Sequence, residues 1–131
     1  MVLLDSSFLI DIMHNASLAT NMFKELKENK TEFFVSPITI MEVWAGALES
    51  RKTSDSQRAK IDEFIANMNI IPFNIKEAKK AAEIEYELSK KGITIEIEDI
   101  MNAGIALTHD QTIISSDIHY TYITNLKTFK Y

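Results

Sequence analysis

The chain begins with the feature that most constrains its fold, a short apolar run that ends at an aspartate. Val2–Leu4 is an unbroken apolar triplet, which is typical of a strand buried on both faces, as in a parallel sheet. Phe8, Leu9 and Ile12 follow with helical spacing, so a helix is predicted directly after the strand. Asp5 therefore lies where a buried strand ends and a helix begins, at the edge of an open α/β sheet where ligands bind.

Two serines follow Asp5, and a hydroxyl from Ser6 or Ser7 is expected to cap the first amide groups of this helix. The Asp5 carboxylate loses hydration free energy at such a buried edge unless something positive meets it. No lysine or arginine stands near Asp5 in the sequence, so the positive partner must come from elsewhere.

The rest of the chain alternates short apolar strands with amphipathic helices. Strands are predicted at 33–35, 70–71 and 112–114, with a further edge strand within 120–131. Helices are predicted at about 17–30, 37–50, 57–68, 75–91 and 99–107. This order favours an α/β fold of three layers, α/β/α, around a small and mostly parallel central sheet. Residues 1–131 contain no linker or low-complexity segment and are expected to form a single domain.

Two glycines and one alternating stretch carry further expectations. Gly46 and Gly104 fall inside predicted helices, where glycine costs about 1 kcal/mol relative to alanine. Close approach of another backbone or of a ligand would account for both. Ile93, Ile95 and Ile97 alternate with polar residues, a pattern that is typical of a strand.

Four acidic residues, Asp5 among them, are the candidates for a functional site. Asp117 follows the strand predicted at 112–114 and is adjoined by serines, as Asp5 is. Glu42 and Asp99 each lie early in a predicted helix, with small or amide side chains three and four positions later. If they converge on one sheet edge, these carboxylates suit a hard divalent cation, Mg²⁺ or Mn²⁺. Their mutual repulsion should raise the pKa of at least one of them in the metal-free protein.

Each acid also has a simpler interpretation when it is taken alone. Asp5 and Asp99 can cap helices. Glu42 can be a solvated helical residue, and Asp117 an ordinary loop acid. Their predicted convergence on one edge is what favours a metal site.

Other kinds of site have little support in the sequence. The histidines, at positions 14, 109 and 119, share no metal-binding spacing and are expected at the surface. The absence of cysteine excludes thiolate metal sites and a cysteine nucleophile. Ser6 and Ser7 lack a nearby base, so a serine nucleophile is not expected.

Composition places the chain among globular proteins, with 46% hydrophobic and 25% charged residues. No apolar run approaches the roughly 20 residues that a membrane span needs, so no membrane partner is expected. The N-terminus lacks a secretory pattern and the chain lacks cysteine, so we expect the protein in the cytoplasm. The net charge of −5 argues against broad nonspecific binding of nucleic acid.

With these residues in this order, the sequence resembles a PIN domain, and most of all the compact VapC-type toxin ribonucleases. The resemblance spans nearly the whole chain and rests on the order and spacing of several segments. They are an apolar strand that ends in Asp (V-L-L-D-S-S-F-L-I), a helix that carries Glu (S-P-I-T-I-M-E-V-W-A-G-A), a helix that opens with Asp (E-D-I-M-N-A-G-I-A) and a strand with a hydroxyl-x-acid ending (I-I-S-S-D).

The resemblance implies a PIN-like fold and an endoribonuclease that depends on Mg²⁺ or Mn²⁺. Asp5 and Asp99 would be the principal metal ligands. Glu42 would be a ligand or a base in the same cluster. Asp117 would be a fourth acid that acts directly or through water, and Ser115 would form a hydrogen bond in the site.

The chain departs from the family's usual pattern near the last acid. The family often has Asp-Phe shortly after it, where this chain has D-I-H-Y at 117–120. Glu96 and Glu98 add acids beside Asp99, and either can join the site. The resemblance also implies that 93–97 is an approach loop rather than a strand.

The resemblance further implies RNA as substrate, a small antitoxin as partner, and a homodimer, for which the fourth helix with Phe64 and Met68 is the predicted contact. The alternatives are a catalytically inactive PIN-like module that binds RNA or protein, and a PIN nuclease that processes ribosomal RNA. A receiver-like domain with Mg²⁺ in an acidic pocket needs an acid pair after the first strand and a lysine after a late one. This sequence has neither.

Overall fold

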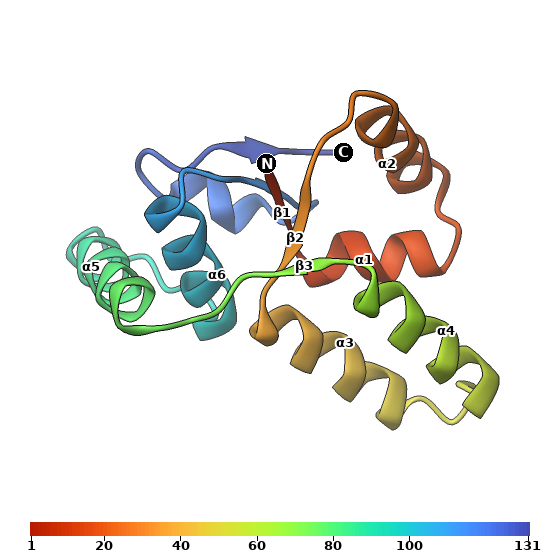
Figure 1. The fold of residues 1–131 in the computed structure, drawn as a ribbon. Helices are drawn as coiled ribbons and strands as arrows, with labels where there is room; N and C mark the ends of the chain where they lie inside the picture. Colours follow the sequence, from red (N-terminus) through yellow and green to blue (C-terminus); the bar gives the residue numbers. More distant parts are fainter.

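A computed structural model describes residues 1–131 and contains a five-stranded sheet in which every pairing is parallel (Figure 1). The strands are β1 (Val2–Leu4), β2 (Phe33–Val35), β3 (Asn69–Ile70), β4 (Thr112–Ile114) and β5 (Thr128–Phe129). Their order across the sheet is β3-β2-β1-β4-β5, so the strand that ends at Asp5 is the middle one.

Six α-helices and one 3₁₀ helix surround this sheet. They are α1 (Ser6–Met13), α2 (Ser17–Glu28), α3 (Pro37–Glu49), α4 (Asp55–Ala66), α5 (Ile75–Lys90), α6 (Ile97–Thr108) and the 3₁₀ helix η1 (Ile118–Tyr122). In Figure 1, α1 and α2 lie on one side of the central strands and α5 and α6 on the other. The predicted three-layer α/β/α fold is therefore confirmed. No helix combines the length and the apolar composition that a bilayer crossing requires.

Two hydrophobic cores, one on each face of the sheet, account for this layering. Leu3 belongs to the core that includes α5 and α6. Val2 and Leu4 belong to the core that includes α1 and α2. Because alternate residues of a strand point to opposite faces, a wholly apolar triplet is buried only when both faces are covered. Ile38 and Val43 of α3 join different cores, which places α3 across the boundary between the layers.

Local interactions set several helix ends where the sequence predicts them. Ser36 caps α3 by accepting a hydrogen bond from the amide of Thr39 at 3.1 Å. Pro37 takes the first helical position, where no amide hydrogen is needed. Gly92 follows α5 with a φ of 70°, a left-handed conformation that glycine adopts without steric cost.

Two local predictions are wrong. Neither Ser6 nor Ser7 caps α1, because Asp5 occupies the N-cap position and both serines lie inside the helix. Residues 93–96 form no strand, and α6 begins at Ile97, so that Asp99 is its third residue. Ile95 belongs to the core that includes α5 and α6, and Ile93 packs against it, although neither residue lies in a strand.

The two helical glycines have different surroundings. A Cβ atom on Gly104 would lie 2.8 Å from the backbone oxygen of Glu77, so α5 and α6 approach each other closely there. A Cβ atom on Gly46 would meet nothing within 4 Å. The expectation of close approach is therefore confirmed for Gly104 and wrong for Gly46.

Gly104→Ala is expected to lower the free energy of unfolding by about 1–3 kcal/mol, the usual cost of over-packing, because the added methyl group meets backbone atoms. Gly46→Ala is the matched control and should raise the free energy of unfolding by up to about 1 kcal/mol through helix propensity alone. Urea unfolding followed by circular dichroism measures both. A stabilised Gly104→Ala protein would contradict the packing described here.

Candidate active site

Asp5 is held at the end of β1 by three hydroxyl groups. Its Oδ2 accepts hydrogen bonds from Ser115 at 2.7 Å and from Ser7 at 3.1 Å. Its Oδ1 accepts one from the Tyr120 hydroxyl at 3.0 Å. The side chain is only 4% exposed and makes no capping hydrogen bond to α1. Asp5 is therefore a buried carboxylate supported by donors from three elements of the chain, and the helix-cap interpretation is wrong.

Asp99 meets Asp5 from the first turn of α6. The same Tyr120 hydroxyl lies 3.2 Å from Oδ1 of Asp99, so a single phenol bridges the two carboxylates. Burial, followed by the negative charge of Asp5, raises the pKa of Asp99 from 3.8 to about 6. The aspartates at the end of β1 and the start of α6 therefore form one electrostatic unit.

Glu42 completes this unit from α3. Its pKa is raised from 4.5 to about 7, first by burial and then by the charges of Asp5, Asp99 and Glu98 in that order of size. Its Oε1 is buried without a hydrogen-bond partner. Glu98 thus acts on the cluster, whereas Glu96 is exposed to solvent. The predicted rise in carboxylate pKa is found for both Glu42 and Asp99.

Asp117 reaches the cluster together with a histidine. It precedes η1 and accepts a hydrogen bond from the backbone amide of His119 at 2.9 Å. Its Oδ1 also lies 3.0 Å from Nδ1 of the same residue. Metal-ligating atoms of Asp99, Asp117 and His119 all lie within 4.8 Å of one another. The structure thus brings all four predicted acids together, and it adds His119.

The sequence interpretation missed His119 and Tyr120. The histidines share no metal-binding spacing with one another, although His119 stands two positions from the candidate acid Asp117. No pattern in the sequence marks the hydroxyl of Tyr120. Ser115, by contrast, forms the hydrogen bond that the family resemblance implies.

A buried polar network fixes α3 against α6 and so sets the position of Glu42 relative to Asp99. The Asn102 side chain donates to Thr39 Oγ1 at 3.1 Å and accepts from the hydroxyl of Ser36. Asn102 lies one turn after Asp99, and Thr39 lies one turn before Glu42. The two carboxylates therefore sit on helices that are locked together within one turn of the site.

The acidic cluster lacks a balancing cation from the protein. Lysine and arginine form ion pairs elsewhere in the structure, and Asp5, Glu42 and Asp99 take part in none of its ion pairs. Carboxylate oxygens are the ligands that Mg²⁺ and Mn²⁺ prefer, and the unpartnered Oε1 of Glu42 is free to contribute one. These residues therefore fit a divalent cation of this kind.

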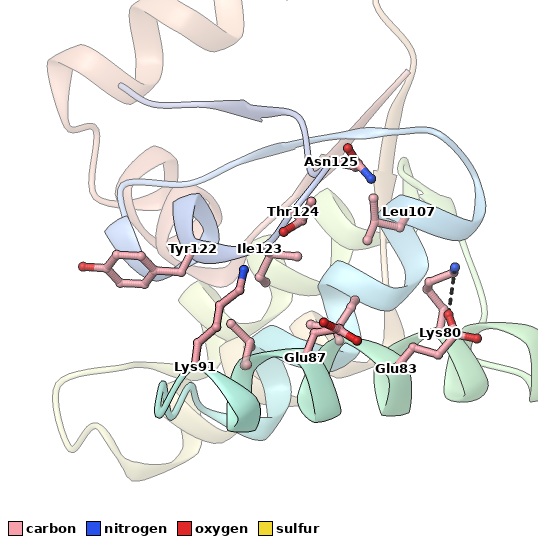
Figure 2. Close-up of a pocket in the computed structure, with 11 residues that line it drawn as sticks. Lys80, Glu83, Glu87, Lys91, Leu107, Tyr122, Ile123, Thr124 and Asn125 are labelled. Atoms are coloured by element: carbon pink, nitrogen blue, oxygen red, sulfur yellow. Dashed lines mark ion pairs between the residues drawn. The ribbon is translucent and has the colours of Figure 1, made fainter.

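A groove of about 360 Å³ lies apart from this cluster, between α5 and the segment that follows η1 (Figure 2). Its lining includes Lys80, Glu83, Lys91 and Tyr122 and none of the four acids. Lys80 and Glu83 neutralise each other at 2.9 Å. Because the groove mixes lysine with glutamate, the acidic cluster is the better candidate for binding a cation.

Comparison with known proteins identifies the family of this chain. The family model described as "PIN domain" matches residues 2–124. This chain belongs to the PIN-domain family. It is 30% identical to the protein named ribonuclease VapC2 of Rickettsia felis over 107 residues, which are 81% of this chain and 78% of that one. It is 27% identical to ribonuclease VapC2 of Haemophilus influenzae, over 88% of this chain and 86% of that one.

Solved structures show the same PIN fold. The chain superposes on one from the VapBC2 complex of Rickettsia felis, bound to a DNA fragment from its promoter, with a TM-score of 0.89 and 24% identity. That match covers 100% of this chain and 99% of the other. A chain of the DNA-bound VapBC complex of Salmonella typhimurium matches with a TM-score of 0.87 and 22% identity, over 99% and 98% of the two chains. The predicted resemblance to VapC-type PIN domains is confirmed.

The raised pKa values predict how the stability of the metal-free protein depends on pH. Folding shifts the pKa of Asp99 from 3.8 to about 6 and that of Glu42 from 4.5 to about 7. The folded state holds these protons more tightly than the unfolded chain, so the free energy of unfolding should fall as pH rises through this range. Glu42→Gln should make the fall shallower, because a carboxamide does not ionise. Melting temperatures measured in chelator from pH 4 to pH 8 test this.

Glu49→Gln is the control for this series, because Glu49 is an exposed acid near the end of the same helix. Its profile should run parallel to that of the parent protein. A Glu42→Gln profile as steep as the parent's would mean that Glu42 does not carry the raised pKa.

Proposed function

We propose that this PIN domain is a divalent-metal-dependent endoribonuclease, the toxin of a toxin–antitoxin pair, and that residues 1–131 form its nuclease unit in the cytoplasm. The observation that carries the proposal is the convergence of Asp5, Glu42, Asp99 and Asp117, of which only Asp117 pairs with a basic side chain, that of His119. The relatives named VapC ribonucleases support RNA as the substrate. A catalytically inactive binding module would have no need to keep four mutually repelling carboxylates together.

Mg²⁺ or Mn²⁺ would be held by Asp5 and Asp99, with Asp117 and Glu42 completing the acidic ligand set. When bound, such an ion stabilises negative charge on a phosphate and acidifies an attacking water. The three hydroxyl donors keep the Asp5 carboxylate oriented for this task. The unpartnered Oε1 of Glu42 would serve either as a ligand of the ion or as the base that accepts the proton of the attacking water.

Asp99→Asn is expected to reduce cleavage of single-stranded RNA by at least roughly a hundredfold, the upper end of what losing a supporting contact costs a metal site. The Mn²⁺-induced rise in melting temperature should shrink in parallel. In chelator at neutral pH the variant should be as stable as the parent or more so, because it removes one repelling charge. Asp99 suits this test better than Asp5, whose replacement would also disturb three hydrogen bonds.

Asp62→Asn, at an exposed position of α4, is the control and should leave both cleavage and the metal response unchanged. Parent protein that cleaves RNA equally well in chelator, or fully active Asp99→Asn protein, would refute metal-dependent catalysis at this cluster.

The proposal includes an antitoxin and a homodimer, because the structural relatives are VapBC complexes. The fourth helix is a weaker contact than predicted, since Phe64 and Met68 pack against this chain's own core.

Exposed apolar side chains lie instead on α3, where Met41 and Leu48 are each 57% exposed. Met41 precedes Glu42 in α3, so a partner that covers Met41 and Leu48 would bind the same helix that carries one acid of the site. We assign this exposed apolar surface of α3, formed by Met41 and Leu48, as the contact for the antitoxin.

Leu48→Lys should therefore abolish a stable complex with the proposed antitoxin, because burying an unpaired ammonium in an apolar contact is costly. Co-purification and light scattering of the co-expressed pair measure this. Leu18→Lys is the control, because Leu18 is also an exposed leucine, at 69%, and lies on a different helix, α2. If Leu48→Lys keeps the complex but converts a dimer of the 15.0 kDa chain to a monomer, this exposed apolar surface of α3 belongs to the homodimer instead.

A further inference from the structure

Tyr120 stands out because it is a core residue whose polar atom lies in the acidic site. The side chain is 1% exposed, and its ring packs in the core with α5 and α6. Its hydroxyl lies 3.0 Å from Oδ1 of Asp5 and 3.2 Å from Oδ1 of Asp99. Apolar packing therefore fixes where the ring sits, and the ring fixes where the donor sits between two carboxylates.

The two carboxylates depend on this hydroxyl to different degrees. Asp5 also accepts hydrogen bonds from Ser7 and Ser115, so its orientation is secured without Tyr120. The Asp99 side chain has the Tyr120 hydroxyl as its one hydrogen-bond donor. Its Oδ2 accepts no hydrogen bond. The phenol thus holds Oδ1 of Asp99 toward Asp5 and leaves Oδ2 available.

The phenol is suited to remain a donor. A tyrosine hydroxyl is protonated at neutral pH, so it can donate a hydrogen bond to either carboxylate. The hydroxyl has a single proton, so its hydrogen bond is shared between the two carboxylates. It therefore reduces their repulsion without neutralising either, which leaves two anionic ligands for a cation.

We propose that Tyr120 is a positioning residue for the metal site: its hydroxyl sets the separation and orientation of Asp5 and Asp99 that a divalent cation requires. This inference rests on the proposed function, since it concerns the same carboxylates. A phenylalanine would fill the same space in the core, so the hydroxyl is not needed for packing. Groups that orient metal ligands typically contribute ten- to a hundredfold to metal affinity.

Tyr120→Phe separates this role from a structural one, because it keeps the ring and removes only the oxygen. The full chain should still unfold cooperatively, while its dissociation constant for Mn²⁺ rises by roughly ten- to a hundredfold. Isothermal titration calorimetry with Mn²⁺ measures this without RNA. The Mn²⁺ concentration for half-maximal cleavage should rise by the same factor, and cleavage at saturating Mn²⁺ should recover most of the parent rate.

Tyr122→Phe is the matched control, because Tyr122 lies in the same 3₁₀ helix and is largely exposed. Its affinity for Mn²⁺ should equal that of the parent. A second measurement uses the parent alone, where adding Mg²⁺ should perturb the near-ultraviolet absorption of a buried tyrosine, and Tyr122→Phe should keep that perturbation. This readout applies even if Tyr120→Phe fails to fold.

The outcomes distinguish the inference from the function on which it rests. If Tyr120→Phe only lowers the melting temperature in chelator and binds Mn²⁺ like the parent, the hydroxyl is structural and the inference fails while the proposed function stands. An unperturbed tyrosine spectrum in a parent that binds Mg²⁺ also overturns it. If the parent binds neither Mn²⁺ nor Mg²⁺, both the inference and the metal-dependent function fail.

Discussion

The repulsion among carboxylates at the end of β1 is the constraint on which the site depends. Burial and neighbouring charge raise the pKa of Glu42 to about 7 and that of Asp99 to about 6, so keeping these acids together costs folding free energy. The protein limits this cost with hydroxyl donors, which bind the anionic form without cancelling its charge. A lysine in their place would satisfy the carboxylates and also compete with a divalent ion. The choice of hydroxyls over cations is therefore what keeps the site able to bind a metal.

The fold tolerates the repulsion among these acids because the surrounding elements prevent them from moving apart. β1 is the central strand, paired on both sides, and the two hydrophobic cores hold it from both faces. Asp5 follows it directly and cannot move away without disturbing the sheet. The buried amide of Asn102 ties α6 to the start of α3, one turn from Asp99 and Glu42. The site is thus built on helices and a strand whose positions are fixed by packing contacts elsewhere in the molecule.

Family membership and site geometry contribute different parts of the functional argument. The match over residues 2–124 and the likeness to VapC ribonucleases identify the family and its ribonuclease activity. A fold can persist after its chemistry is lost, so membership alone does not separate an active nuclease from an inactive module. The four converging acids favour the active enzyme. The chain also has features that the common pattern does not supply, namely a histidine beside Asp117 and a phenol between Asp5 and Asp99.

The sequence by itself determined the architecture and the acids, because those signals are local. A strand buried on both faces, a serine–proline helix start and a glycine after a helix each follow from the residues that form them. Only the tertiary structure decided the roles of Tyr120 and His119, the packing at Gly104 and the loop at 93–96. A tyrosine hydroxyl can donate a hydrogen bond to a functional site only when the packing of its ring directs it toward a carboxylate from another part of the chain. Likewise, an alternating run becomes a strand only where it pairs with a neighbouring strand, and residues 93–96 pair with no strand of this sheet.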